Sequence, residues 1–256
     1  MQTVFCKASS SAIQCVQLQK PYEYDLKQVI ISKRGAILLK RSVVLTILLV
    51  MLIAGAVLGG WIWINLPTGT HVIAGEIREY NGQKLGSVTD FRDEAINGDQ
   101  HINSSTYTLT ITGLVQNVTV LTYDDVVNKH THYQKVVTLH CVEGWQVTAL
   151  WEGVRLKDLL GEAGYDQNAQ VVIFYAQDGY TTSLPLAYII DNNIMIASKV
   201  NGLILPASEG YPLRLVAEGK LGYKWIKWIT KIEVSNNVNF RGFWESNGYD
   251  NNANWP

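Results

Sequence analysis

The lone cysteine Cys141 is the side chain after residue 65 whose type is best suited to chemistry. It lies within Thr138–Trp145, which reads Thr-Leu-His-Cys-Val-Glu-Gly-Trp, and the other two cysteines, Cys6 and Cys15, come far earlier in the chain. A free thiol in a domain that faces an oxidising space needs a reason to stay unpaired. We consider three explanations, which are metal ligation, nucleophilic catalysis and simple burial.

A nucleophilic cysteine needs a histidine base within hydrogen-bonding reach. His140 directly precedes Cys141, and neighbouring side chains of an extended strand point to opposite faces, so His140 is poorly placed for that role. The remaining histidines lie in a polar loop or near the beginning of the domain: His71, His101, His130 and His132. A cysteine-cluster zinc site is excluded because only one cysteine is available, whereas a Cys–His hydrolase stays open as an alternative.

Two later stretches carry positive charge next to glycine. Arg214 lies inside the apolar run Tyr211–Val216, so we expect it to be buried with an anionic partner. The stretch Gly219–Lys227 combines glycine with lysines, a pattern that suits a phosphate-like or pyranopterin-like anion. For Lys220 itself, a solvent-exposed position on a strand is the preferred interpretation.

The elements that must position these residues are short strands and helices. Alternation or β-branched runs predict strands at Tyr107–Thr112, Val136–Leu139, Val171–Tyr175 and Trp225–Val234. Helices are predicted for Leu156–Gly161, which ends in glycine, and for Leu184–Ile190. The segment Phe240–Pro256 is expected to pack as irregular chain. Because strands and helices interleave without regular βαβ spacing, the sequence predicts one mixed α+β domain over residues 70–256.

The N-terminal part has a different character. Ser42–Ile64 contains no charged residue, which is typical of a membrane-spanning helix, and we expect a transmembrane anchor at residues 42–65. Residues 1–41 carry seven Lys and Arg residues against two acidic ones, so the positive-inside rule predicts a cytoplasmic tail there. The protein is then a single-pass cell-membrane protein with an extracytoplasmic domain. A net charge of −1 over the whole chain argues against nucleic acid as a partner.

Several blocks resemble the molybdopterin-binding core of the sulfite oxidase family, and they occur in the family's order. The Cys-Val-Glu-Gly-Trp form of the first block is more similar to the bacterial methionine-sulfoxide-reductase catalytic subunit than to the animal sulfite oxidases. The blocks are Thr138–Trp145, Trp151–Leu156, Asp178–Leu186, Asn201–Gly202 with Leu205–Pro206, Gly210–Arg214 and Gly222–Trp228.

The resemblance implies a molybdenum–molybdopterin cofactor, with molybdenum held by one pyranopterin dithiolene and by Cys141 as the one protein ligand. A soft thiolate suits such a metal–sulfur centre. Glu209 lies where relatives carry His or Asn, and a carboxylate is a poor phosphate ligand. Arg92 and Asn97 lie in the region of an Asn-Asn-Phe-Tyr type motif that this chain lacks. The implied cofactor contacts are Arg214, Trp225, Ile226, Lys227, Ala176, Tyr180, Glu209, Asn97 and Arg92.

The implied reaction is two-electron oxygen-atom transfer between molybdenum and a small-molecule oxygen donor or acceptor. Sulfite oxidation requires several cations around the substrate, and this chain has few spare arginines, so reduction of an S- or N-oxide is favoured. No haem-binding domain is expected within the chain, which implies a separate membrane cytochrome or quinone-linked redox partner. A non-catalytic module that binds a pterin or a protein on the same fold is the competing hypothesis.

Overall fold

The structure is a computed structural model that describes residues 6–9, 12–15, 46, 49–55, 73–92 and 94–255. The chain divides into two compact units, Met1–Thr70 and His71–Pro256, and each is described by itself. In the first unit, strand β1 (Cys6–Ser9) pairs antiparallel with β2 (Ala12–Cys15), and residues 49–55 are helical. None of the helices among the described residues has the length and apolar character needed to cross a membrane. Most of the predicted anchor at 42–65 lies outside the described residues, so the anchor stays a prediction.

The second unit contains two five-stranded sheets. The first sheet has the order β10-β9-β14-β5-β6, in which only β14 and β5 run parallel. Its strands are β5 (Thr108–Gly113), β6 (Thr119–Thr122), β9 (Val171–Ala176), β10 (Thr181–Pro185) and β14 (Ile229–Ser235).

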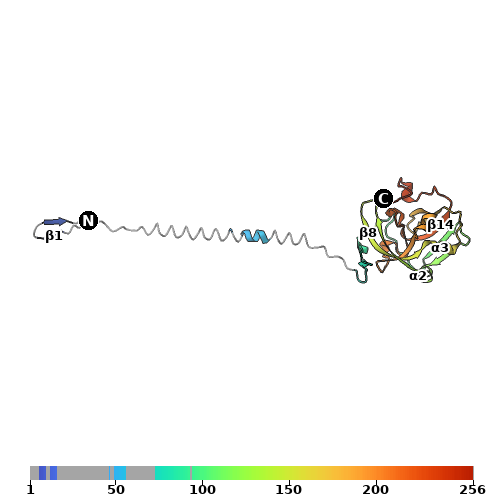
Figure 1. Cartoon of the computed structure of the whole chain (residues 1–256), viewed down its shortest axis with the longest axis horizontal. Helices are drawn as coiled ribbons and strands as arrows, with labels where there is room; N and C mark the ends of the chain where they lie inside the picture. Colours follow the sequence, from blue (N-terminus) through green and yellow to red (C-terminus); the bar gives the residue numbers. More distant parts are fainter. Residues whose placement is uncertain are drawn as a thin grey trace. The chain divides into compact units, whose positions relative to one another are not determined.

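The second sheet has the order β12-β11-β8-β7, and β13 also pairs with β11. All of its pairings are antiparallel. Figure 1 shows β8 of this sheet and β14 of the first sheet on opposite sides of the unit. The strands are β7 (Tyr133–His140), β8 (Gln146–Arg155), β11 (Met195–Val200), β12 (Leu203–Ile204) and β13 (Arg214–Val216).

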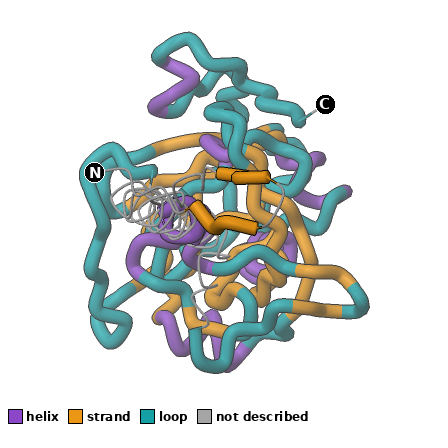
Figure 2. Tube along the Cα trace, turned by 90° about the vertical axis from the view of Figure 1, so that its left-hand side faces the viewer, coloured by secondary structure: helices purple, strands orange, loops and turns teal. Residues whose placement is uncertain are grey.

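Both sheets and the helices contribute to one hydrophobic core. In the helix α3 (Leu156–Ala163), the leucines Leu156, Leu159 and Leu160 recur at helical spacing and are fully buried against the strands. The remaining helices are short, and Figure 2 shows the chain after β14 as loop with one short helix. The other elements are β3 (Glu79–Tyr80), β4 (Gln83–Lys84), η1 (Val88–Asp90), α2 (Tyr123–Lys129), α3 (Leu156–Ala163), α4 (Leu186–Asp191), η2 (Ala207–Glu209), η3 (Gly222–Lys224) and α5 (Phe243–Ser246).

The mixed α+β prediction is confirmed, with differences at element ends. Helix α3 continues through Gly161 to Ala163 and is capped by Gly164, whose φ of 66° is the left-handed conformation that glycine adopts without strain. The predicted strand Trp225–Val234 begins only at Ile229. Its first part turns away because Trp228 has a φ of 51° and donates its indole N–H to the carbonyl of Ala207 at 2.8 Å.

Candidate functional site: a cavity beside Cys141

Cys141 lies at the tip of the hairpin formed by β7 and β8. The last pair of that ladder joins His140 to Gln146, and the five residues between them form the turn. The Cys141 amide donates to the carbonyl of Trp145 at 2.9 Å, and the Gly144 amide donates to the carbonyl of Cys141 at 3.1 Å. Gly144 has a φ of 87°, which closes this turn without strain. The hairpin therefore holds a free, half-buried thiol at a fixed position.

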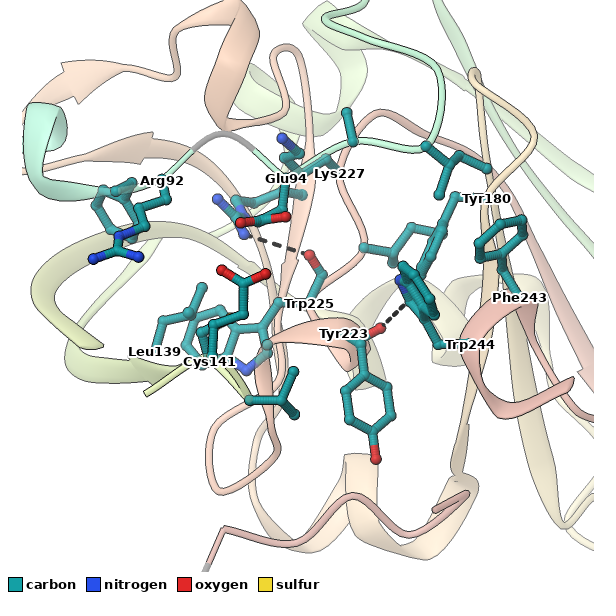
Figure 3. A pocket seen from close by; sticks show the side chains of 18 of the residues that line it. Arg92, Glu94, Leu139, Cys141, Tyr180, Tyr223, Trp225, Lys227, Phe243 and Trp244 are labelled. Atoms are coloured by element: carbon teal, nitrogen blue, oxygen red, sulfur yellow. Dashed lines mark hydrogen bonds between the residues drawn. The ribbon is translucent and has the colours of Figure 1, made fainter. Parts of the chain in front are cut away.

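A cavity of about 490 Å³ opens beside this thiol. Its wall comes from five parts of the chain: the segment around residues 91–96, the β7–β8 turn, the β9–β10 turn, the segments from η2 to Trp228, and residues 243–249. Figure 3 shows Cys141 and Leu139 on one side of the cavity, with Tyr180, Phe243 and Trp244 on the other. Gly222 of η3 approaches the hairpin closely, since a Cβ there would lie 3.6 Å from the Cα of Cys141.

Arg214 lines this cavity from β13 and is buried, as its apolar neighbours predicted. Its Nη1 donates to Glu209 Oε2 at 2.6 Å, and both side chains are almost fully removed from solvent. Burial lowers the pKa of Arg214, although the neighbouring Glu209 carboxylate opposes that shift. Glu209 therefore neutralises the charge of Arg214, the residue that the family resemblance predicts to contact the cofactor.

The loop Trp225–Lys227 follows η3 and contributes three predicted contacts to the wall. Trp225 is buried and its indole donates to the carbonyl of Lys220 at 2.9 Å. Lys227 donates to the carbonyl of Ser208 at 2.7 Å and lies over the Trp228 ring. The expectation that Lys220 is solvent-exposed is wrong, because it is buried and bonds to Asn254 and to the carbonyl of Asn252.

Two other predicted contacts line the cavity and two do not. Arg92 and Tyr180 belong to the wall, and the Tyr180 hydroxyl donates to the carbonyl of Tyr223 at 2.6 Å. Ala176 is buried within β9, where its amide pairs with the Tyr180 carbonyl, so it supports the turn and is absent from the wall. Asn97 is exposed and outside the wall, and its carbonyl accepts a bond from the Gln100 side chain.

The sequence prediction missed a group of wall residues from the C-terminal segment. Phe243, Trp244 and Tyr249 line the cavity although the segment was expected only to pack as irregular chain. Its richness in aromatic residues was a signal, but nothing in their spacing indicated which cavity they face. Glu94 and Glu143 were also missed as wall residues.

The arrangement around Cys141 does not favour a nucleophilic cysteine. Burial, together with the nearby Glu143 and Glu94 carboxylates, raises the pKa of the Cys141 thiol, whereas reactive cysteines have a lowered pKa. Of the histidines that the structure describes, none lines the cavity. His140 instead stacks its ring on Trp255, with centroids 3.9 Å apart.

The residues around the cavity fit a metal whose other ligands come from a cofactor. Within the described part of the chain, no group of three His, Cys, Asp or Glu residues could hold a metal by itself, which leaves Cys141 as a single soft ligand. Arg214 Nε and Trp145 Nε1 are buried without a hydrogen-bond partner among the described residues, and both residues line the cavity. Buried donors of this kind suit a polar bound group.

Comparison with known proteins gives the same assignment. The profile of the oxidoreductase molybdopterin binding domain family matches residues 97–244. The uncharacterized oxidoreductase YuiH of Bacillus subtilis is 35% identical over 56% of this chain and 72% of its own length. The putative protein-methionine-sulfoxide reductase subunit YedZ1 of Azospira oryzae is 34% identical over 59% of this chain, which is 57% of that protein.

A more distant relative and a solved structure extend this likeness. Mouse mitochondrial sulfite oxidase is 28% identical over 58% of this chain and 32% of its own. The crystal structure of the sulfane dehydrogenase SoxCD from Paracoccus pantotrophus superposes with a TM-score of 0.53 and 25% identity, covering 56% of this chain and 42% of that one. The family match spans the hairpin, β13 and the η3 loop that together surround Cys141, and its cofactor is molybdenum–molybdopterin. The chain belongs to the sulfite oxidase family of molybdopterin-dependent oxidoreductases.

Proposed function

We propose that this protein is a membrane-anchored molybdenum oxidoreductase that reduces an organic S- or N-oxide. The charge of the cavity is the observation that carries the direction of the reaction. The Arg, Lys, Asp and Glu residues of the wall are Arg92, Arg214, Lys227, Glu94, Glu143, Asp178 and Glu209. Because Arg214 is paired with Glu209, the other two cations share the wall with three carboxylates. Such a wall disfavours the entry of sulfite and tolerates a neutral oxide.

The balanced reaction is the reduction of a sulfoxide or amine oxide by two electrons and two protons, giving the sulfide or amine and water. The bond between oxygen and sulfur or nitrogen breaks, and the oxygen leaves as water. When bound, molybdenum–molybdopterin supplies a two-electron centre that exchanges an oxygen atom with such substrates. The electrons come from a separate redox partner.

The side chains of this protein have distinct tasks in that reaction. The Cys141 thiolate holds the metal, and the β7–β8 turn keeps its sulfur at the cavity wall. Arg214 and the loop Trp225–Lys227 bind the anionic part of the cofactor, while Glu209 balances the buried guanidinium. Tyr180 does not serve as a proton donor, because its hydroxyl is committed to a backbone carbonyl and burial raises its pKa.

The test is a screen of the full chain purified from a host that makes the cofactor. We expect stoichiometric molybdenum and viologen-coupled turnover of sulfoxides or N-oxides that exceeds sulfite oxidation. Cys141→Ser should lose activity while it remains folded. Cys15→Ser, which lies outside the family match, is the matched control.

Two results would count against the proposed function. Folded protein without molybdenum would support the non-catalytic binding module on the same fold. Sulfite turnover above that of every oxide would show that the direction is reversed.

The anchor and the orientation belong to the same proposal. The uncharged run Ser42–Ile64 and the basic residues before it support a single-pass protein with a cytoplasmic N-terminus and an extracytoplasmic domain. A membrane cytochrome or quinone-linked protein is then the natural electron donor. Protease added to intact spheroplasts should degrade the domain, and complete protection of the domain would reverse the topology.

A further inference from the structure

Five aromatic residues of the cavity lining form a continuous series of ring contacts, called here the aromatic wall: Tyr180, Phe243, Trp244, Tyr249 and Tyr223. Successive ring centroids along this order are 5.9, 5.3, 5.2 and 5.2 Å apart, with tilted or edge-on geometry. The Tyr180 hydroxyl donates to the Tyr223 carbonyl, which joins the two ends of the series. All five residues line the cavity. Figure 3 labels Tyr180, Tyr223, Phe243 and Trp244 among them.

These rings retain surface that a ligand can cover. Phe243, Trp244 and Tyr249 are 37%, 37% and 36% exposed, although each contacts other rings. Large apolar side chains that stay partly open at the mouth of a cavity are typical of ligand-binding surfaces. Ring faces also attract cations, and carboxylates at Glu94, Glu143 and Asp178 lie along the same cavity.

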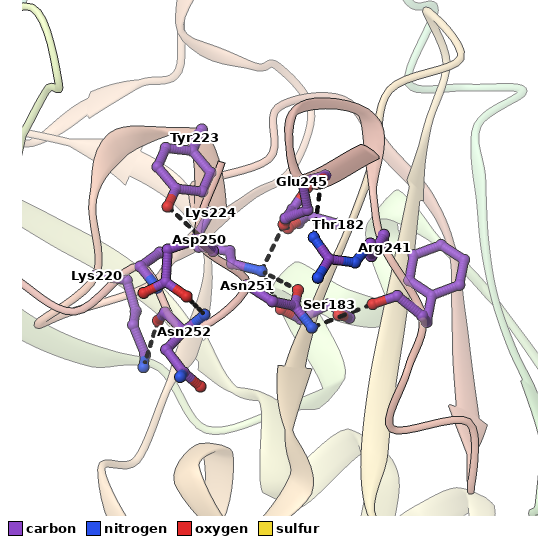
Figure 4. Close-up of polar contacts among 12 residues, drawn as sticks. Thr182, Ser183, Lys220, Tyr223, Lys224, Arg241, Glu245, Asp250, Asn251 and Asn252 are labelled. Carbon is purple, nitrogen blue, oxygen red and sulfur yellow. Dashed lines mark hydrogen bonds and ion pairs between the residues drawn. The ribbon is translucent and has the colours of Figure 1, made fainter. Parts of the chain in front are cut away.

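A buried polar network fixes the segment that carries three of these rings. Lys224 of η3 forms an ion pair with Glu245 of α5, and both side chains have no solvent exposure. Lys224 also donates to the Ser183 carbonyl at 3.0 Å and to Asn251 at 3.2 Å (Figure 4). The Thr182 hydroxyl donates to Glu245 at 2.6 Å, so α5 is tied to both β10 and η3. The network therefore ties the segment that carries Phe243, Trp244 and Tyr249 to β10 and η3.

We propose that the aromatic wall is the specificity determinant of this site and that it binds the carbon substituent of the oxide. The wall selects substrates with an aryl group, above all an aryl group that bears positive charge, and it disfavours small alkyl oxides and anionic aryl oxides. This inference rests on the proposed function and names its substrate class. Lys224 and Glu245 act as positioning residues, because they touch the segment and do not line the cavity.

The test compares matched sulfoxides on the molybdenum-loaded full chain. The series is dimethyl sulfoxide, methyl phenyl sulfoxide, and methyl phenyl sulfoxide bearing a para trimethylammonium or a para sulfonate group. We expect kcat/KM to be about tenfold higher for the phenyl than for the dimethyl compound, and about tenfold higher for the cationic than for the anionic aryl compound. Trp244→Leu should reduce the aryl preference about threefold to tenfold, and Trp244→Phe, which keeps a ring, should restore most of it.

A binding measurement separates this inference from the proposed function. Methyl phenyl sulfone, which carries two oxygens on sulfur, serves as a probe of binding without turnover in calorimetric titration. We expect Trp244→Leu to weaken sulfone binding about threefold to tenfold. Phe240→Ala removes a ring close in sequence that does not line the cavity, and it should leave sulfone binding unchanged. Sulfone binding that is weakened in Trp244→Leu, together with no turnover of any sulfoxide, would refute the proposed reductase function. It would still support the role of the aromatic wall in binding an aryl group.

Three results would overturn the proposal that the aromatic wall determines specificity. One is an unchanged aryl preference in Trp244→Leu. Another is an equal loss for dimethyl and phenyl compounds, which would indicate a merely structural role. The third is equal kcat/KM for the cationic and anionic aryl sulfoxides.

Discussion

The fully buried ion pair between Lys224 and Glu245 yields the sharpest stability prediction. In Lys224→Met the carboxylate of Glu245 loses its cation while it stays buried, and it keeps only the Thr182 hydroxyl as a hydrogen-bond donor among the contacts described above. Removing one partner of a buried pair costs about 3–5 kcal/mol, because an uncompensated charge is left in a low-dielectric environment. We therefore expect the free energy of unfolding of the domain to fall by that amount.

The assay is thermal and urea unfolding followed by circular dichroism. For a domain of this size, 1 kcal/mol changes Tm by about 2–4 °C, so Lys224→Met should melt roughly 6–20 °C lower. The double variant Lys224→Met with Glu245→Leu removes both charges and should recover most of the loss. Lys129→Met is the matched control, because Lys129 pairs with Asp125 at the surface with 68% of its side chain exposed, so its loss should leave the free energy of unfolding almost unchanged.

A loss of unfolding free energy in Lys224→Met no greater than that in Lys129→Met would contradict this prediction. A double variant as unstable as the sum of the single variants would also contradict it, since the two charges would then not interact. Either result would mean that water reaches this pair in solution.

Three further predictions follow from other contacts. A Cβ at Gly242 would lie 2.2 Å from the Thr181 carbonyl oxygen, so Gly242→Ala should displace α5 and reduce kcat/KM for aryl sulfoxides more than for dimethyl sulfoxide, as steady-state kinetics would show. Glu209→Gln leaves the Arg214 cation buried without its carboxylate, so cofactor-free protein should lose about 3 kcal/mol in urea unfolding, and cofactor loading should raise its Tm more than that of the wild type. Burial by itself raises the pKa of Glu76, but hydrogen bonds from four neighbouring groups outweigh it and hold that pKa below the ordinary 4.5. The stabilisation from Glu76 is thus fully present above about pH 4.5 and is lost as pH falls through the lower folded-state pKa, so Glu76→Gln should flatten the pH dependence of unfolding below about pH 5.

Local patterns in the sequence predicted the elements that hold Cys141. Alternation in Tyr107–Thr112 corresponds to β5, and the apolar run before Cys141 corresponds to the end of β7. Arg214 was predicted to be buried because its immediate neighbours are apolar. These features depend on residues next to one another in the chain, which periodicity and composition can report.

Features that depend on distant residues could not be predicted in this way. Lys220 is buried because its partners, Asn252 and Asn254, come some thirty residues later. The aromatic wall exists because α5 is tied back to β10 and η3, and no local pattern in Phe240–Pro256 indicates that return. Ala176 is buried within β9 and absent from the cavity wall, and its assignment as a cofactor contact, made by family position, stays a prediction.

The buried tie between η3 and α5 also closes a loop in the chain. Lys224 and Glu245 are 21 residues apart in sequence, and β14, the middle strand of the first sheet, lies between them. The side of the cavity lined by residues 243–249 therefore cannot separate from η3 unless a fully desolvated ion pair breaks.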